Sequence, residues 1–150
     1  MTKFVFRLER VLDWRQTELS LEEAKYKRLA ARLAALHAHK DGLNAAILEV
    51  GRGPDRSRSV SAADLAVSAA CRERLVREVA AAEGKIVECG RLLAAQRESM
   101  VAARRRVRLL ENLKERRRVE WSAAFEKELE EMAAESSQSR WRRELAGSRA

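Results

Sequence analysis

A seven-residue repeat of apolar side chains runs through most of this chain and constrains its fold more than any other feature. From Val5 to Val50, apolar residues fill eleven of the fourteen a and d positions, and from Leu65 to Ala124 they fill thirteen of eighteen. Such a pattern is typical of helices that pack through a narrow seam. The residues expected in this seam are Leu8, Leu12, Leu19, Tyr26, Leu29, Leu33, Leu36, Leu43, Ile47, Leu75, Val79, Ile86, Leu93, Met100 and Val107.

One break interrupts the repeat. Two glycines and the only proline fall in residues 51–60, where a helix must stop. Beyond it, Ser61 and Asp64 have the spacing of a capping box, with Asp in the place of Glu. We therefore expect a single all-α domain over residues 1–150, a long antiparallel two-helix coiled coil or helical hairpin. Helix 1 should span about 3–50, the loop about 51–60, helix 2 about 62–135, and the frayed tail 136–150.

The unequal helix lengths predict an unpaired end. A register that sets Val50 beside Leu65 also places large side chains against small ones, as in Tyr26 opposite Cys89. In that register helix 1 ends opposite residue 112, so the second helix extends beyond it. The large apolar residues of this extension have no expected partner within the chain and favour a contact with another protein, although a bend or self-association would also cover them. They are Trp121, Phe125, Leu129 and Met132.

Positive charge gathers next to this extension. The chain carries a net charge of +8, and residues 101–120 hold eight basic and three acidic side chains. Runs of consecutive arginines fan around a helix, which suits an acidic ring better than the one-sided patch typical of nucleic-acid binding, and a solvated helix face is the simpler alternative. The residues proposed for a protein contact here are Arg7, Arg104, Arg108, Arg116, Arg118, Trp121 and Phe125.

The sequence lacks the motifs of catalysis and of cofactor binding. His37 and His39 point away from each other on a helix, and no paired-cysteine or phosphate-loop motif occurs. Cys71 and Cys89 lie five turns apart, too far to bridge, and agree with a reducing compartment. No stretch approaches the ~20 apolar residues of a membrane helix. We therefore expect no catalytic residues, metal, cofactor, small-molecule substrate or membrane insertion.

Two blocks of the chain resemble the FliJ family of flagellar export proteins. The opening Phe4-Val5-Phe6-Arg7-Leu8-Glu9-Arg10-Val11-Leu12-Asp13-Trp14-Arg15 is similar to that family's F-x-F-x-L-x-x-V-L-x-x-R pattern. The stretch from Leu110 to Met132 resembles its second block, an L-E-x-L-K-E-K/R run followed by an acidic helix end. This chain has Glu130-Glu131-Met132 where the family often has an Asp-Glu step.

The resemblance implies a non-enzymatic component of the type III export apparatus that is similar to the central stalk of rotary ATPases. Its expected partners are a hexameric export ATPase, the cytoplasmic part of the export gate and export chaperones. The expected location is the cytoplasm, with peripheral association at the inner membrane. A basic helical nucleic-acid-binding protein and a purely structural, self-associating coiled coil remain as alternatives.

Overall fold

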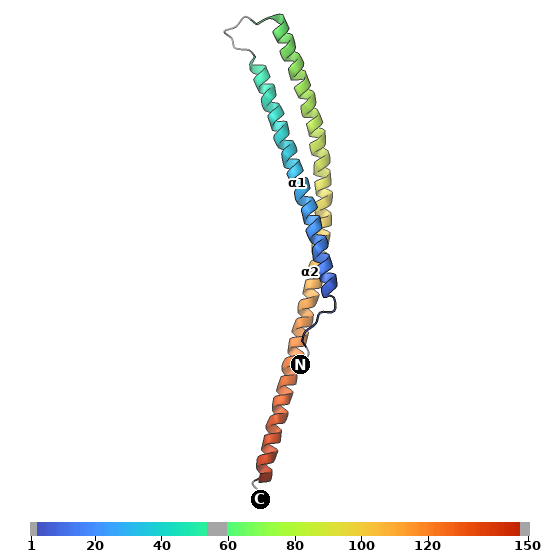
Figure 1. Cartoon of the computed structure of the whole chain (residues 1–150), viewed down its shortest axis with the longest axis vertical. Helices are drawn as coiled ribbons and strands as arrows, with labels where there is room; N and C mark the ends of the chain where they lie inside the picture. The colour runs from blue at the N-terminus through green and yellow to red at the C-terminus, as the bar shows by residue number, and fades with distance from the viewer. Residues whose placement is uncertain (1–2, 54–59, 148–150) are drawn as a thin grey trace. The chain divides into compact units, whose positions relative to one another are not determined.

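Two helices make up nearly all of the described chain. The computed structural model describes residues 3–53 and 60–147, with side chains up to residue 143. Helix α1 spans Glu9–Arg52 and helix α2 spans Ala62–Gly147. The described residues contain no strand. The predicted all-α helical hairpin is confirmed (Figure 1).

The chain divides into two compact units, which we describe separately. The central unit comprises residues 17–104, and the terminal unit comprises residues 1–16 and 105–150. In the central unit, α1 and α2 run side by side in opposite directions (Figure 1). Its core is formed by Leu43, Leu75 and Ala82, which pack against half-buried neighbours such as Ile47 and Val79.

Burial follows the heptad repeat. All of the predicted seam residues are buried or half-buried except Leu8, which is exposed and precedes α1. The most buried positions of α2 hold mainly small side chains, Ala82, Cys89 and Ala103, together with Leu75 and Val107. Small side chains on one helix leave room for larger ones on the facing helix, so that the two interdigitate.

The register of the central unit differs from the expected one by three residues. The Cys89 thiol donates to the carbonyl oxygen of Leu29 at 3.7 Å, so Cys89 lies against Leu29 and not against Tyr26. One heptad further along α2, the Gln96 side-chain amide donates to the carbonyl oxygen of Glu22 at 3.2 Å and also to the Glu22 carboxylate.

The polar pair gives the physical reason for this correction. The expected register would have set Gln96 against Leu19 and Glu22 against Leu93, leaving both polar side chains facing apolar ones. Pairing Gln96 with Glu22 satisfies both groups at once. The pKa of the Glu22 carboxyl is lowered, first by its hydrogen bond from Lys25 and then by that from Gln96.

The helix ends beside the break differ slightly from their expected positions. Helix α1 continues to Arg52, and Gly53 then adopts a left-handed φ of 74° while its amide donates to the Val50 carbonyl oxygen at 3.3 Å. Residues 54–59 of the predicted loop lie outside the described residues. Leu65 is exposed and does not take the seam position beside Val50 that the expected register gave it.

The capping box at the start of α2 is confirmed. The Asp64 amide donates to the Ser61 hydroxyl oxygen at 3.2 Å, and the Ser61 amide and hydroxyl donate to the Asp64 carboxylate at 3.0 and 2.7 Å. These two hydrogen bonds to the carboxylate lower the pKa of Asp64. These reciprocal hydrogen bonds satisfy amide groups of the first turn of α2 within the chain segment itself.

Both outer helix boundaries need correction. Helix α1 begins at Glu9, not near residue 3, because residues 3–8 are non-helical. Helix α2 continues through the predicted tail to Gly147, not ending near residue 135. The hydroxyls of Ser136 and Ser137 each donate to the Ala133 carbonyl oxygen at 2.9 Å, so these serines satisfy their polar groups within the helix. Residues 148–150 of that tail lie outside the described residues.

Candidate protein-interaction site

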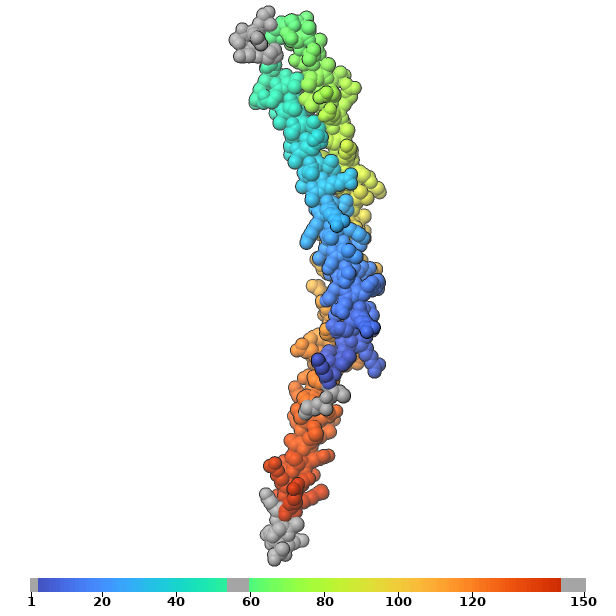
Figure 2. Space-filling view, viewed as in Figure 1, coloured from blue at the N-terminus to red at the C-terminus, as the bar shows by residue number. Residues whose placement is uncertain are grey.

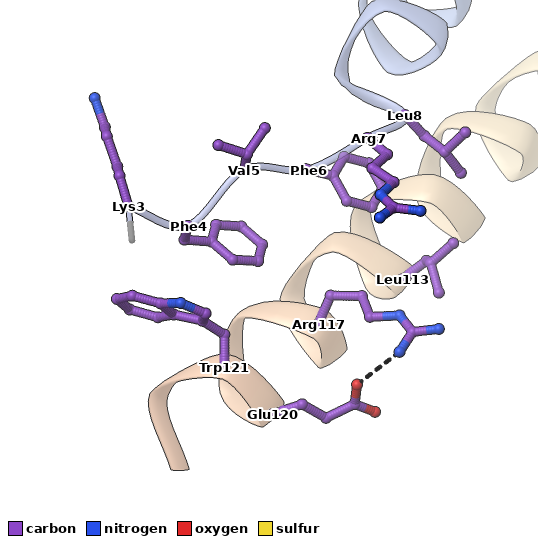
Figure 3. A pocket seen from close by; sticks show the side chains of 10 residues that line it. All are labelled: Lys3, Phe4, Val5, Phe6, Arg7, Leu8, Leu113, Arg117, Glu120 and Trp121. Carbon is purple, nitrogen blue, oxygen red and sulfur yellow. Dashed lines mark hydrogen bonds and ion pairs between the residues drawn. The ribbon is translucent and has the colours of Figure 1, made fainter. Parts of the chain in front are cut away.

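The N-terminal segment of the terminal unit lies along α2 in an extended conformation. Residues 3–8 form a pocket with Leu113, Arg117, Glu120 and Trp121 (Figure 3). Phe4 and Phe6 both face α2, whereas Val5 between them points away and is 75% exposed. In an extended chain, alternate side chains point to the same side, so Phe4 and Phe6 can both contact α2. In a helix, two residues separated by one position would point in different directions.

An aromatic cluster forms at this contact. Phe6 is buried, and the Phe4 ring lies 6.0 Å from that of Trp121 at a tilt of 53°. The Trp121 ring stacks in turn on Phe125 at 5.5 Å and 7°. We call Phe4, Phe6, Trp121 and Phe125 the aromatic patch.

The aromatic patch corrects the prediction that Trp121 has no partner within the chain. Phe4 covers one side of Trp121, although 36% of the tryptophan stays exposed. Phe125 is half-buried, since it gains cover from Trp121. Leu129 and Met132 are exposed as expected, at 40% and 52%.

Two ion pairs hold the charged side chains beside the patch. Lys114 Nζ lies 2.6 Å from the carboxylate of Glu9, at the first residue of α1. Arg117 donates to Glu120 at 3.0 Å along α2, as Figure 3 shows. Lys114 and Arg117 fall at a and d positions of the repeat, so these pairs compensate charge at positions that are otherwise mostly apolar.

The predicted arginines fall into different surroundings. Arg7 lines the pocket beside Phe6. Arg108, Arg116 and Arg118 are exposed on α2, and no carboxylate of the described residues lies within ion-pairing distance of them. Arg104 belongs to the central unit, where it pairs with Glu23 at 2.8 Å. Arg104 is therefore already engaged in an ion pair, unlike Arg108, Arg116 and Arg118.

Sequence reasoning did not place Phe4 and Phe6 in the candidate site. It assigned these residues to a helix because Val5 and Leu8 fit the start of the heptad repeat. The signal that could have found them is the Phe-x-Phe spacing, since two aromatics separated by one residue share a face only in an extended chain.

The described residues contain neither a metal-binding cluster nor a membrane-spanning helix. Among residues 3–53 and 60–147, no group of three or more His, Cys, Asp or Glu side chains could hold a metal ion. In the same ranges, no helix has an apolar run of the length needed to span a bilayer. The resolved pKa shifts belong to ion pairs and to the α2 cap, at Glu22, Asp64, Glu88 and Arg91.

Comparison with known proteins adds no relative. No protein-family model matches the chain, and neither a curated protein nor a solved structure matches it. The candidate site is therefore interpreted from its own residues. Trp121 is 36% exposed, and Arg118 on the same helix has no carboxylate of the described residues within ion-pairing distance. Tryptophan and arginine are the residue types enriched among the energetic centres of protein interfaces.

Proposed function

We propose that this protein is a non-enzymatic coiled-coil component of the flagellar type III export apparatus that engages a hexameric export ATPase as a stalk. The observation that carries the proposal is the terminal unit, where the aromatic patch lies on a helix that continues well past Trp121. The same helix carries Arg108, Arg116 and Arg118, for which no carboxylate of the described residues lies within ion-pairing distance. The resemblance of the Phe4–Arg15 and Leu110–Met132 blocks to the FliJ family supplies the identity of the partner. By the same resemblance, the export gate and export chaperones are further partners, reached from the cytoplasm at the inner membrane.

The two kinds of side chain should contribute in different ways. Arg116 and Arg118 should accelerate association with an acidic surface and make it sensitive to salt. Trp121 should slow dissociation, because buried tryptophans at interfaces are often worth about 2 kcal/mol or more on truncation. Such a loss corresponds to roughly 30-fold in affinity.

ATP turnover by the cognate export ATPase, measured with and without the full chain, tests the proposal. Wild-type protein should stimulate turnover or hexamer formation. Arg116→Glu with Arg118→Glu should lose stimulation chiefly at low salt, and Trp121→Ala should lose it at any salt. All variants should keep the helical circular dichroism of the wild type.

Matched variants separate these effects from general changes in charge or size. Arg28→Glu with Arg32→Glu reverses the same charge on exposed positions of α1, and Trp141→Ala removes an exposed tryptophan. Both should stimulate like the wild type. No stimulation by wild-type protein would refute the stalk proposal. Tight DNA binding that weakens steeply with salt would favour the nucleic-acid alternative, and self-association would favour the structural one.

A further inference from the structure

A second apolar surface begins at Phe125, the last residue of the aromatic patch, and continues along α2. Phe125, Leu129 and Met132 are spaced by four and three residues and therefore share one helix face, which we call the C-terminal stripe. Leu129 and Met132 are exposed, and no described segment covers them. In Figure 2 the red end of α2 carries no other segment on the face in view.

Glutamates flank the C-terminal stripe on both sides. Steps of about 100° per residue place Glu128 and Glu135 on one side and Glu126 and Glu130 on the other. Residues 121–135 contain five glutamates and one lysine in a chain whose net charge is +8. The segment that carries the stripe is therefore acidic, although the chain as a whole is basic.

The charges of these glutamates are largely uncompensated. Lys127 lies 3.9 Å from Glu131, and the Ser122 hydroxyl donates to Glu126 at 3.4 Å. Among the described residues, no cation lies within ion-pairing distance of Glu128, Glu130 or Glu135. These three carboxylates are therefore available to pair with positive charges of a partner that lies beside the stripe.

We infer that the C-terminal stripe binds an amphipathic helix of a partner protein whose apolar face is bordered by lysines and arginines. A second helix is the element that fits a flat helix face, with anchors spaced by three and four residues. Opposite charges on its borders would meet the flanking glutamates, as in the flanking positions of coiled coils.

A second copy of this chain does not fit the same surface. Pairing the stripe with itself, in either direction, sets the glutamate borders of one copy against those of the other. Like charges in such positions destabilise the pair. The charge pattern therefore favours a basic partner over a homodimer.

The same face also limits the length of the partner helix. Arg118 lies seven residues before Phe125, and Arg143 lies eighteen residues after it, so both are on the face of the stripe. A basic helix would be repelled at both positions and should lie between them. This inference does not depend on the export ATPase, because it rests only on the stripe and its borders.

Binding of designed peptides to the full-length chain tests the inference by fluorescence anisotropy. The probe is a labelled helix of about 18 residues with a leucine stripe bordered by lysines and arginines. One control peptide has the same residues in scrambled order, and another replaces the basic residues by glutamate. We expect the basic amphipathic peptide to bind at least tenfold more tightly than either control.

Substitutions in the chain assign the binding to the stripe. Leu129→Ala with Met132→Ala should weaken binding at least tenfold, whereas Leu109→Ala with Val119→Ala, at exposed positions of α2, should not. Glu128→Lys with Glu135→Lys should weaken binding of the basic peptide and gain binding of the acidic one. The matched control, Glu73→Lys with Glu98→Lys, should behave like the wild type.

Three outcomes would overturn the inference. Equal binding of the scrambled peptide would show that the attraction does not require a helix face. Binding that survives the loss of Leu129 and Met132 would place the peptide elsewhere. A dimer in light scattering that disappears in the same double variant would show that a second copy occupies the stripe. None of these measurements involves ATP turnover, so they are independent of the proposed function.

Discussion

Truncating Leu43 should destabilise the hairpin more than truncating a leucine five residues away. Leu43 is 8% exposed and packs in the core with Leu75 and Ala82, whereas Leu48 on the same helix is 66% exposed. Leu43→Ala removes three buried carbons, which at ~0.8 kcal/mol each gives about 2.4 kcal/mol. A small cavity term raises the expected loss to about 3 kcal/mol, toward the low end for core leucines because a two-helix seam lets water reach the site.

The control holds helix propensity constant. Leucine and alanine have similar propensities, so Leu48→Ala should change the free energy of unfolding by no more than ~0.5 kcal/mol. Urea denaturation followed by far-UV circular dichroism measures both variants against the wild type. Leu43→Ala combined with Leu75→Ala should depart from additivity by ~0.5 kcal/mol or more, since the two residues share one core.

The reasoning would be refuted by equal stabilities of the two single variants. Such a result would mean that the Leu43 side chain is no better buried than that of Leu48, and the seam assignment of α1 would be wrong. A loss in Leu43→Ala with full additivity in the double variant would leave the burial intact but contradict the shared core with Leu75.

Three further predictions concern the register and the helix ends. Gly53→Ala should lower the free energy of unfolding by ~1–2 kcal/mol, because the φ of Gly53 is 74°. Gly51→Ala should raise it by up to ~1 kcal/mol, because Gly51 is helical and nothing lies within 4 Å of the added carbon. Urea denaturation midpoints that move in the same direction for both variants would contradict this. Leu29→Cys should form an intramolecular disulfide with Cys89 on mild oxidation, detected by mass spectrometry, and its absence would count against the register. The folded pKa of Asp64 is lowered, so its capping contribution is complete above the unfolded pKa and is lost as the pH falls through the folded one. The protection factors of the first amides of α2, which compare their hydrogen exchange with the intrinsic rate at the same pH, should fall over that range in the wild type and should stay unchanged in Asp64→Asn.

The candidate site was only partly predictable. Trp121 and Phe125 stand out in the sequence as large apolar residues past the end of the first helix. Phe4 did not, because Phe4-Val5-Phe6 at the edge of a heptad repeat is compatible with a helix and with an extended segment. Burial of Phe6 and the contact of Phe4 with Trp121 decide between these conformations. The Phe4–Trp121 contact joins residues more than a hundred positions apart.

Local features of the sequence determined the fold class. The heptad repeat specifies two helices with one apolar face each, the Ser61 and Asp64 pair starts α2, and a glycine at residue 53 follows the end of α1. Each of these depends on residues within a few turns of one another. A single sequence therefore carries enough information to predict them.

Only the tertiary structure decided how the two helices meet. A heptad seam offers several registers of similar apolar burial, because a and d positions both lie on the apolar face and a slip of three, four or seven residues still sets apolar positions against each other. The choice is made by the polar side chains that interrupt the seam, Gln96 and Glu22, which are satisfied when they face each other and unsatisfied when either faces leucine. The sequence shows these two residues as exceptions to the repeat, but their pairing depends on a contact across the whole hairpin that no local pattern encodes.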